Sequence, residues 1–298
     1  MKNNNLKGIF VALVTPFAPD GSVAYDALAT HVRHSINSGI EGFYVCGSTG
    51  EALLLTLEER KHILEIVVEA AKGRCPVICH CGAVGTQLSS DLARHAVASG
   101  VDAVSSVSPF YYHFSSQEII DYYKEIADAC GKPVIVYNIP SLSGVSVTPP
   151  MMHKMCEHPE IIGLKFTSND LFSMEQIKTD LPNLIVYNGF DEMLLAGLSM
   201  GADGAIGSTY NVMGKYFVQI RDLFLQNRMQ EALVTQRKAN GLIASMSNTG
   251  KLFACLKYII SLRGIPFGDC RRPFAALNDA DIRLCMQINK TLIDDGIV

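Results

Sequence analysis

The chain has 298 residues, 48% hydrophobic and 18% charged, with a formal net charge of −4. This composition is sufficient for a large hydrophobic core and excludes a disordered chain. The sequence has no run of Lys and Arg that could bind the phosphates of a nucleic acid, so we expect no nucleic-acid partner. Four of the first five residues are polar, and the apolar stretch from Gly8 to Val14 is too short to span a bilayer. We therefore expect no membrane segment, no targeting segment and a cytoplasmic protein whose nine cysteines are free thiols.

Eight short apolar runs alternate along the chain with segments of helical periodicity. They recur about every 28 residues, the length of a strand, a helix and two short loops. Because the runs are continuously apolar, they are typical of parallel strands buried on both faces. The predicted strands are Ile9–Val14, Gly42–Val45, Pro76–Cys81, Ala103–Val107, Pro133–Asn138, Ile161–Phe166, Leu184–Tyr187 and Gly204–Ile206.

Local signals mark where the intervening helices begin and end. Two predicted capping boxes join a hydroxyl to a glutamate three residues later, Thr56 with Glu59 and Ser115 with Glu118. Three glycines follow predicted helix ends, where a left-handed residue is favoured, at Gly39, Gly73 and Gly100. Eight such βα units favour closure into a (β/α)8 TIM barrel over an open sheet.

Helical patterns continue beyond the eighth strand. They cover Lys215–Leu225, Met229–Met246, Lys251–Leu262 and Asp279–Ile293. The last three exceed what eight βα units need, so we expect a C-terminal helical extension packed on the barrel. No Pro/Gly/Ser-rich linker separates it, and we predict a single domain over residues 1–298, with the barrel at about 1–226 and the extension at about 227–298.

Lys165 carries the strongest chemical signal in the sequence. Active sites of (β/α)8 barrels lie at the C-terminal ends of the strands, and Lys165 stands near the end of the sixth. Burial in an apolar barrel favours the neutral amine, which can attack a ketone and form an imine. A protonated imine is an electron sink for C–C cleavage. The alternative is a lysine whose ammonium group reaches solvent from a strand end.

Other strand ends supply further polar groups. Tyr137 lies near the end of the fifth predicted strand and is a candidate proton shuttle. The alternative is an ordinary tyrosine at the rim of the barrel, where this residue is common. Ser48 and Thr49 lie between two glycines after the second strand, where hydroxyls and backbone N–H groups suit a small carboxylate. The alternative for these two residues is an ordinary loop before a helix.

Two acidic residues and one Cys-His-Cys run also carry side chains that could bind a ligand. Asp191 and Glu192 follow the seventh strand, either as acids favoured at a helix N-terminus or as acceptors for substrate hydroxyls. Cys79-His80-Cys81 has metal-binding residue types. In a strand, however, the two cysteines face one way and the histidine the other, and no second ligand pair has zinc spacing. We therefore expect no metal site.

Together these motifs resemble the N-acetylneuraminate lyase and dihydrodipicolinate synthase superfamily over nearly the whole chain. The resemblance rests on Val14-Thr15-Pro16-Phe17, Gly47-Ser48-Thr49-Gly50-Glu51, Tyr137-Asn138-Ile139-Pro140 and Gly163-Leu164-Lys165. It implies that Lys165 forms a Schiff base with a 2-oxo acid and that Tyr137 shuttles protons. It also implies that Ser48 and Thr49 hold the carboxylate of that acid.

A second set of positions separates the branches of this superfamily. Dihydrodipicolinate synthases carry an arginine shortly after the Tyr-Asn-x-Pro motif, where this chain has Ser141-Leu142-Ser143-Gly144. An anionic second substrate would be unpaired there. The chain is instead similar to the sialic acid lyases. That resemblance implies contacts to an N-acetyl and polyhydroxyl portion from Thr167, Gly189, Asp191, Glu192 and Ser208.

The resemblance implies a reversible retro-aldol cleavage of N-acetylneuraminate to N-acetylmannosamine and pyruvate, without a metal or organic cofactor. One alternative is another pyruvate-dependent aldolase of the superfamily that acts on a different sugar acid. A second is a non-catalytic 2-oxo acid sensor, and the presence of both Lys165 and Tyr137 counts against it.

An aromatic loop, Ser108-Pro109-Phe110-Tyr111-Tyr112, follows the fourth strand. Exposed aromatic clusters often mark interfaces, although the chain's own helices could also cover this one. The resemblance implies that Tyr111 crosses a dimer contact to join the neighbour's proton relay, and that two dimers form a homotetramer.

Overall fold

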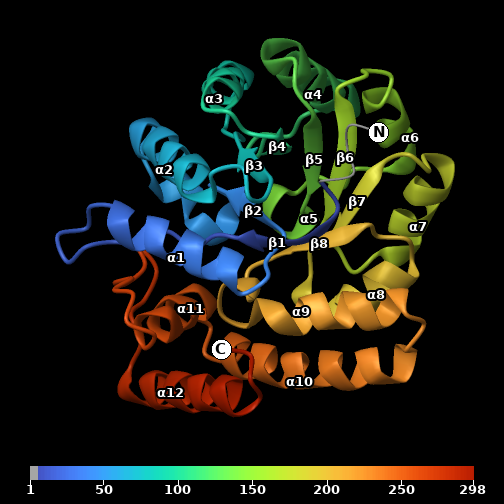
Figure 1. The fold of residues 1–298 in the computed structure, drawn as a ribbon. Coiled ribbons are helices and arrows are strands. Elements are labelled where there is room, and N and C mark those ends of the chain that lie inside the picture. Colours follow the sequence, from blue (N-terminus) through green and yellow to red (C-terminus); the bar gives the residue numbers. More distant parts are fainter. Residues whose placement is uncertain (1–5) are drawn as a thin grey trace.

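The computed structural model describes residues 6–298, so the polar start at residues 1–5 lies outside it. Eight parallel strands close into a barrel in chain order, with the last paired to the first (Figure 1). The strands are β1 Gly8–Ala12, β2 Gly42–Val45, β3 Val77–His80, β4 Ala103–Val107, β5 Val134–Asn138, β6 Ile161–Phe166, β7 Ile185–Asn188 and β8 Gly204–Gly207. All eight predicted strands are confirmed, with ends that differ by at most two residues.

Helices on the outside of the barrel follow each strand, and those before α9 lie between successive strands (Figure 1). Their bounds are α1 Tyr25–Asn37, α2 Leu57–Ala71, α3 Thr86–Ala98, α4 Ser116–Cys130, α5 Pro140–Ser143, α6 Pro149–Met155, α7 Leu171–Asp180, α8 Leu194–Ser199 and α9 Tyr210–Leu225. Short 3-10 turns lie at η2 Ser48–Gly50, η3 Ala52–Leu54 and η4 Asp191–Met193. Both predicted capping boxes are present, at the starts of α2 and α4, and satisfy backbone N–H groups there.

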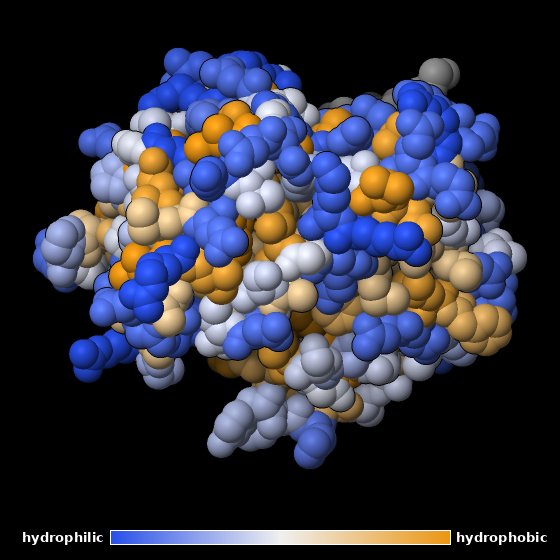
Figure 2. All heavy atoms as spheres, turned by 90° about the horizontal axis from the view of Figure 1, so that it is seen from below, coloured by the Kyte–Doolittle hydropathy of each residue, from blue (hydrophilic) through white to orange (hydrophobic). Residues whose placement is uncertain are grey.

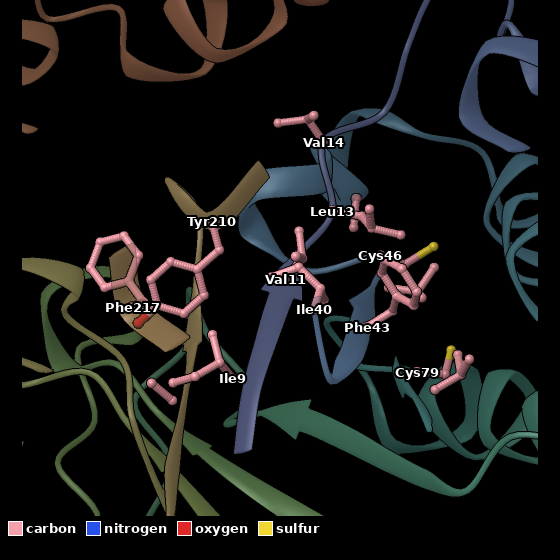
Figure 3. Packing of buried hydrophobic residues seen from close by; sticks show 14 of the residues in the cluster. Ile9, Val11, Leu13, Val14, Ile40, Phe43, Cys46, Cys79, Tyr210 and Phe217 are labelled. Atoms are coloured by element: carbon pink, nitrogen blue, oxygen red, sulfur yellow. The ribbon is translucent and has the colours of Figure 1, made fainter. Parts of the chain in front are cut away.

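Alternation along the strands divides the core into two layers. In β1, Ile9 and Val11 face outward to the helices, while Phe10 faces the barrel interior. Figure 3 shows the outer layer, in which Ile9 lies near Tyr210 and Phe217 of α9 and Val11 lies near Ile40. The inner layer joins Phe10 to aromatic and aliphatic side chains from other strands, which are Tyr44, Ile78, Ile135, Tyr137, Ile185, Tyr187 and Ile206. The barrel is therefore filled by side chains, as its diameter requires.

Three helices follow the barrel, as the sequence predicts: α10 Met229–Ser247, α11 Leu252–Ser261 and α12 Asp279–Asp294. Helix α10 packs along α9, and α11 packs against α12 (Figure 1). Figure 2 shows the molecule from below, toward the side on which α10 and α12 lie in Figure 1, and hydrophobic groups are interspersed with hydrophilic ones there. Within residues 6–298, no helix combines the length and apolar character that a bilayer crossing needs.

Candidate active site

Lys165 points into the barrel because of its place in the strand alternation. Its neighbours Leu164 and Phe166 belong to the outer layer, so the lysine side chain faces inward and is only 5% exposed. Its register partners are Tyr137 on β5 and Tyr187 on β7. This burial contradicts the alternative of a lysine that reaches solvent and agrees with the expectation of a buried amine.

Two tyrosine rings surround the lysine nitrogen. Lys165 Nζ lies 4.1 Å from the ring centroid of Tyr137 and 4.4 Å from that of Tyr44. The two rings meet edge to face at 6.0 Å. The Tyr44 hydroxyl donates to Ser105 Oγ (3.1 Å), and Ser105 in turn donates to the Ile135 carbonyl (2.8 Å). Burial raises the pKa of Tyr44 well above its ordinary value, so this phenol stays protonated.

Sequence reasoning did not find Tyr44 or Ser105. The signal available was the same alternation, because Phe43 and Val45 flank Tyr44 and face outward. That pattern places Tyr44 inside the barrel but does not say which strand-end side chain it meets.

His80 packs with this aromatic group, whereas the two cysteines beside it in the sequence face the other side of the strand. Its ring lies 6.2 Å from that of Tyr137, while Cys79 and Cys81 pack in the outer layer. Its Nδ1 donates to the Cys46 carbonyl (2.9 Å), and its Nε2 accepts from the Val107 N–H (3.1 Å). Burial, followed by the charge of nearby Arg60, lowers the pKa of His80 to about 3. The predicted opposite facing of these residues is confirmed, and residues 6–298 contain no group of three His, Cys, Asp or Glu side chains suited to a metal.

The Gly-Ser-Thr-Gly loop meets the end of β8 at a hydroxyl pair. Thr49 Oγ1 and Ser208 Oγ lie 2.6 Å apart, and Thr49 is buried. The Thr15 hydroxyl, which follows β1, donates to the Gly50 carbonyl (2.7 Å). Ser48 opens the turn η2 and is exposed. The structure thus brings Thr49 and Ser208 together, although 159 positions separate them in the sequence.

Thr167 and Gly189 are in direct contact at the ends of β6 and β7. The Gly189 N–H donates to the Phe166 carbonyl (2.9 Å), and a Cβ at Gly189 would collide with Thr167 Oγ1. Thr167 Oγ1 is buried and has no hydrogen-bond partner within the described chain. Glycine is therefore required at position 189 for this close approach.

Asp191 and Glu192 open the turn η4 and have different environments. Asp191 Oδ2 accepts from the Thr209 N–H (2.8 Å) and the Thr209 hydroxyl (2.7 Å). Its Oδ1 is buried and lacks a partner among residues 6–298. Burial outweighs the Thr209 hydrogen bonds and raises the pKa of Asp191 to about 6. Glu192 is exposed.

Tyr111 differs from the residues around Lys165 because its side chain is 87% exposed. It lies in the loop between β4 and α4 with a positive φ of 80°, and its ring packs at 5.1 Å against Tyr112. The structure gives Tyr111 no buried position within one chain.

A closed (β/α)8 barrel with a buried lysine at the strand ends, held between tyrosines, defines a barrel protein of the class I aldolase type. The model of the dihydrodipicolinate synthetase family matches residues 5–291. The chain belongs to this family.

The similarity to known proteins extends over nearly the whole chain. An N-acetylneuraminate lyase of Rhizobium meliloti is 43% identical over 277 residues, which cover 93% of this chain and 92% of the relative. The N-acetylneuraminate lyase of Fusobacterium nucleatum complexed with pyruvate has a TM-score of 0.92 and 35% identity, and covers 97% of this chain and 98% of its own. CdNal of Clostridium difficile in complex with mannosamine has a TM-score of 0.94 and 35% identity, with coverage of 96% and 99%.

Proposed function

We propose that the protein is an N-acetylneuraminate lyase, a class I aldolase that reversibly cleaves N-acetylneuraminate to N-acetylmannosamine and pyruvate. The observation that carries the proposal is Lys165, whose nitrogen is buried between the rings of Tyr137 and Tyr44. The 43% identity to the Rhizobium meliloti lyase over nearly the full length supports the choice of reaction.

The proposed reaction begins when Ser48 and Thr49 bind the C1 carboxylate of the open-chain sugar acid. The Lys165 amine attacks the C2 ketone, and loss of water gives the protonated imine. Tyr137, directly or through the substrate carboxylate, takes the proton from the C4 hydroxyl. The C3–C4 bond breaks and its electron pair moves into the iminium, so N-acetylmannosamine leaves as the aldehyde. Protonation of the enamine at C3 and hydrolysis release pyruvate and free Lys165.

The sugar end of the substrate would contact Thr167, Gly189, Asp191, Glu192 and Ser208. Two buried oxygens there, Thr167 Oγ1 and Asp191 Oδ1, have no partner within residues 6–298, and substrate hydroxyls would satisfy them. The 2.6 Å contact between Thr49 and Ser208 supports a continuous site, because it joins the proposed carboxylate loop to the proposed sugar end. Lys165 itself supplies the electron sink, so the reaction needs no metal or organic cofactor.

The segment after Tyr137 supports a neutral rather than an anionic acceptor. Leu142 stands in the segment where the synthases carry arginine, and its side chain is 66% exposed. The acidic pair Asp191 and Glu192 would repel an anionic aldehyde and accept hydrogen bonds from a polyol. Another sugar acid remains the second candidate substrate.

We also propose a cytoplasmic homotetramer in which Tyr111 of one subunit enters the site of its neighbour. The 87% exposure of Tyr111 beside exposed Tyr112 supports an interface at this loop. All nine cysteines are free, which supports a reducing compartment.

The test is a coupled assay of pyruvate release from a panel of sugar acids. We expect N-acetylneuraminate to be cleaved with the highest kcat/KM, and pyruvate with N-acetylmannosamine to give N-acetylneuraminate. Asp191→Ala should raise KM for the sugar more than for pyruvate, because this side chain would touch only the sugar end. Preference for a different sugar acid would support the second candidate, and pyruvate binding without any turnover would support a sensor. Rapid condensation with aspartate semialdehyde would contradict the assignment to the lyases.

A further inference from the structure

Glu51 closes the proposed carboxylate loop and forms an ion pair with the C-terminal extension. Lys257 Nζ, on α11, lies 2.5 Å from Glu51 Oε1, and both side chains are 0% exposed. Glu51 Oε2 accepts the backbone N–H of Arg271 at 2.7 Å. Glu51 itself adopts a left-handed conformation with a φ of 57°, which is uncommon for a residue other than glycine. The loop end is therefore held by contacts from more than 200 residues further along the chain.

Neighbouring contacts bind the same segment to the extension. The Lys257 nitrogen lies 4.2 Å from the Phe17 ring centroid, and it also donates to the Asp269 carbonyl (3.2 Å). The Arg271 guanidinium donates to the Leu54 carbonyl (2.9 Å) and pairs with Glu59 of α2. Removing two charges from water costs free energy, and a well-packed apolar pair of the same size often stabilises a fold equally. The ion pair instead fixes one geometry for the end of the loop.

A separate set of contacts from α10 holds the turn η4, which carries Asp191 and Glu192 at the proposed sugar end of the site. Gln236, on α10, is buried; its Nε2 donates to the Asp191 carbonyl (3.2 Å) and its Oε1 accepts from the Leu195 N–H (3.0 Å). The Asn240 side chain donates to the Glu192 carbonyl (3.0 Å). Gln236 also donates to Asn240 at 2.8 Å, so the two amides act as one unit.

We infer that the C-terminal helices position the two substrate-binding loops through two separate sets of contacts: Lys257 acts through Glu51 on the loop that binds the 2-oxo acid, and Gln236 with Asn240 acts on the turn η4 that binds the sugar. This inference rests on the proposed function. Lys257 and Gln236 are positioning residues, since each acts through the loop that it holds. The barrel and the extension thus form one catalytic unit, in which the extension determines substrate affinity at both ends of the site.

The chain offers a matched control for this inference. Lys251 and Asp281 form another ion pair of the extension, at 2.8 Å, and it joins the start of α11 to α12 without contacting either loop. Three substitutions then replace a polar side chain by an apolar one of similar length: Lys257→Met, Gln236→Met and Lys251→Met.

Steady-state kinetics of the condensation reaction, with pyruvate and N-acetylmannosamine varied separately, give the KM of each substrate for each variant. We expect Lys257→Met to raise KM for pyruvate roughly tenfold and to leave KM for N-acetylmannosamine within about twofold of wild type. Gln236→Met should instead raise KM for N-acetylmannosamine and leave KM for pyruvate within about twofold of wild type. Lys251→Met should leave both KM values unchanged, whatever its effect on the unfolding temperature. Equal changes in both KM values for Lys257→Met and Gln236→Met would overturn the inference.

A second variant separates positioning from stability. Lys257→Met leaves Glu51 buried without its partner, which destabilises the fold, whereas Lys257→Met with Glu51→Gln removes both charges. We expect the double variant to recover the unfolding temperature but to keep the raised pyruvate KM. A wild-type pyruvate KM in the folded double variant would refute the inference.

Borohydride trapping with pyruvate alone distinguishes failure of the proposed function from failure of the inference about Lys257. If wild type traps pyruvate on Lys165 but does not cleave N-acetylneuraminate, the proposed substrate is wrong, and the pyruvate dependence of trapping still tests Lys257. A weaker pyruvate dependence in Lys257→Met supports the inference, and an unchanged one overturns it.

Discussion

Lys165 and Tyr137 are register partners on adjacent strands, and the lysine nitrogen lies over the tyrosine ring, 4.1 Å from its centroid. Parallel pairing of β5 with β6 therefore fixes the spacing between the proposed nucleophile and the proposed proton shuttle. Because both side chains are at most 5% exposed, neither can move far without disturbing the inner layer of the barrel.

Incubation with pyruvate and borohydride should attach one reduced pyruvyl group to Lys165, because the buried amine faces the strand ends. Peptide mapping by mass spectrometry locates the label, and Lys165→Met should abolish it. Lys257 is an internal control: it is equally buried but is ion-paired with Glu51, so it should stay unlabelled. Label on a different lysine would refute the proposed mechanism.

Tyr137→Phe should separate imine formation from bond cleavage. The variant keeps the ring beside Lys165 but loses the hydroxyl, so pyruvate should still be trapped on Lys165. The kcat for N-acetylneuraminate cleavage should fall by roughly 10²–10⁴, the usual contribution of a general acid or base. The matched variant Tyr44→Phe loses a hydroxyl that bonds Ser105, and it should affect kcat much less. A near-normal kcat in Tyr137→Phe would exclude it as the proton shuttle.

The affinity for the sugar should depend on pH through Asp191. Burial raises the pKa of this carboxyl to about 6, so it is a carboxylate above that pH and becomes protonated as the pH falls through it. Protonation removes a charged acceptor, and KM for N-acetylmannosamine should therefore rise below about pH 6, whereas KM for pyruvate should not. Asp191→Asn should have a raised KM that is flat over this range. An unchanged pH profile in Asp191→Asn would assign the titration to another group.

Gly189→Ala should weaken sugar binding and lower the unfolding temperature, because the new Cβ would collide with Thr167 Oγ1 and crowd the Phe166 carbonyl. The control is Gly241→Ala in the middle of α10, where an added Cβ meets nothing within 4 Å. That change should stabilise the helix slightly, by about 1 kcal/mol at most. Thermal unfolding and the KM for N-acetylmannosamine measure both effects, and equal behaviour of the two variants would show that residue 189 has room for a side chain.

Mixed oligomers test the proposed role of Tyr111. Tyr111→Phe and Lys165→Ala should each be nearly inactive alone. Co-refolding should restore activity, because some sites would combine an intact Lys165 with an intact Tyr111 from a neighbouring subunit. Formation of mixed oligomers without activity, or a fully active monomer, would contradict the shared site.

Much of the barrel could be predicted from the sequence because the signals are local. Strand alternation and capping boxes act over two to four residues, so the chain specifies them without its tertiary neighbours. The two-residue period of a strand also placed Cys79 and His80 on opposite faces, and this orientation argued against a metal site that uses both residues.

The resemblance to a known family added the roles of residues that the pattern alone left ambiguous, such as Tyr137 and Thr49. For Lys165, the strand position alone favoured a buried amine. Its contact with Tyr44, however, depends on closure of the barrel, which brings β2 opposite β6.

Only the tertiary structure could show what holds the two loops of the site. Glu51 ends a short motif, and nothing near it in the sequence indicates that its partner is Lys257. The same is true of Gln236 and the Asp191 carbonyl, which meet because α10 packs back on the barrel. Such pairs produce no periodic pattern in the sequence, because their geometry arises from the packing of elements that are far apart along the chain. The sequence alone determined the eight strands and the two-residue alternation along each of them, and the three-dimensional packing decided which inward-facing side chains meet.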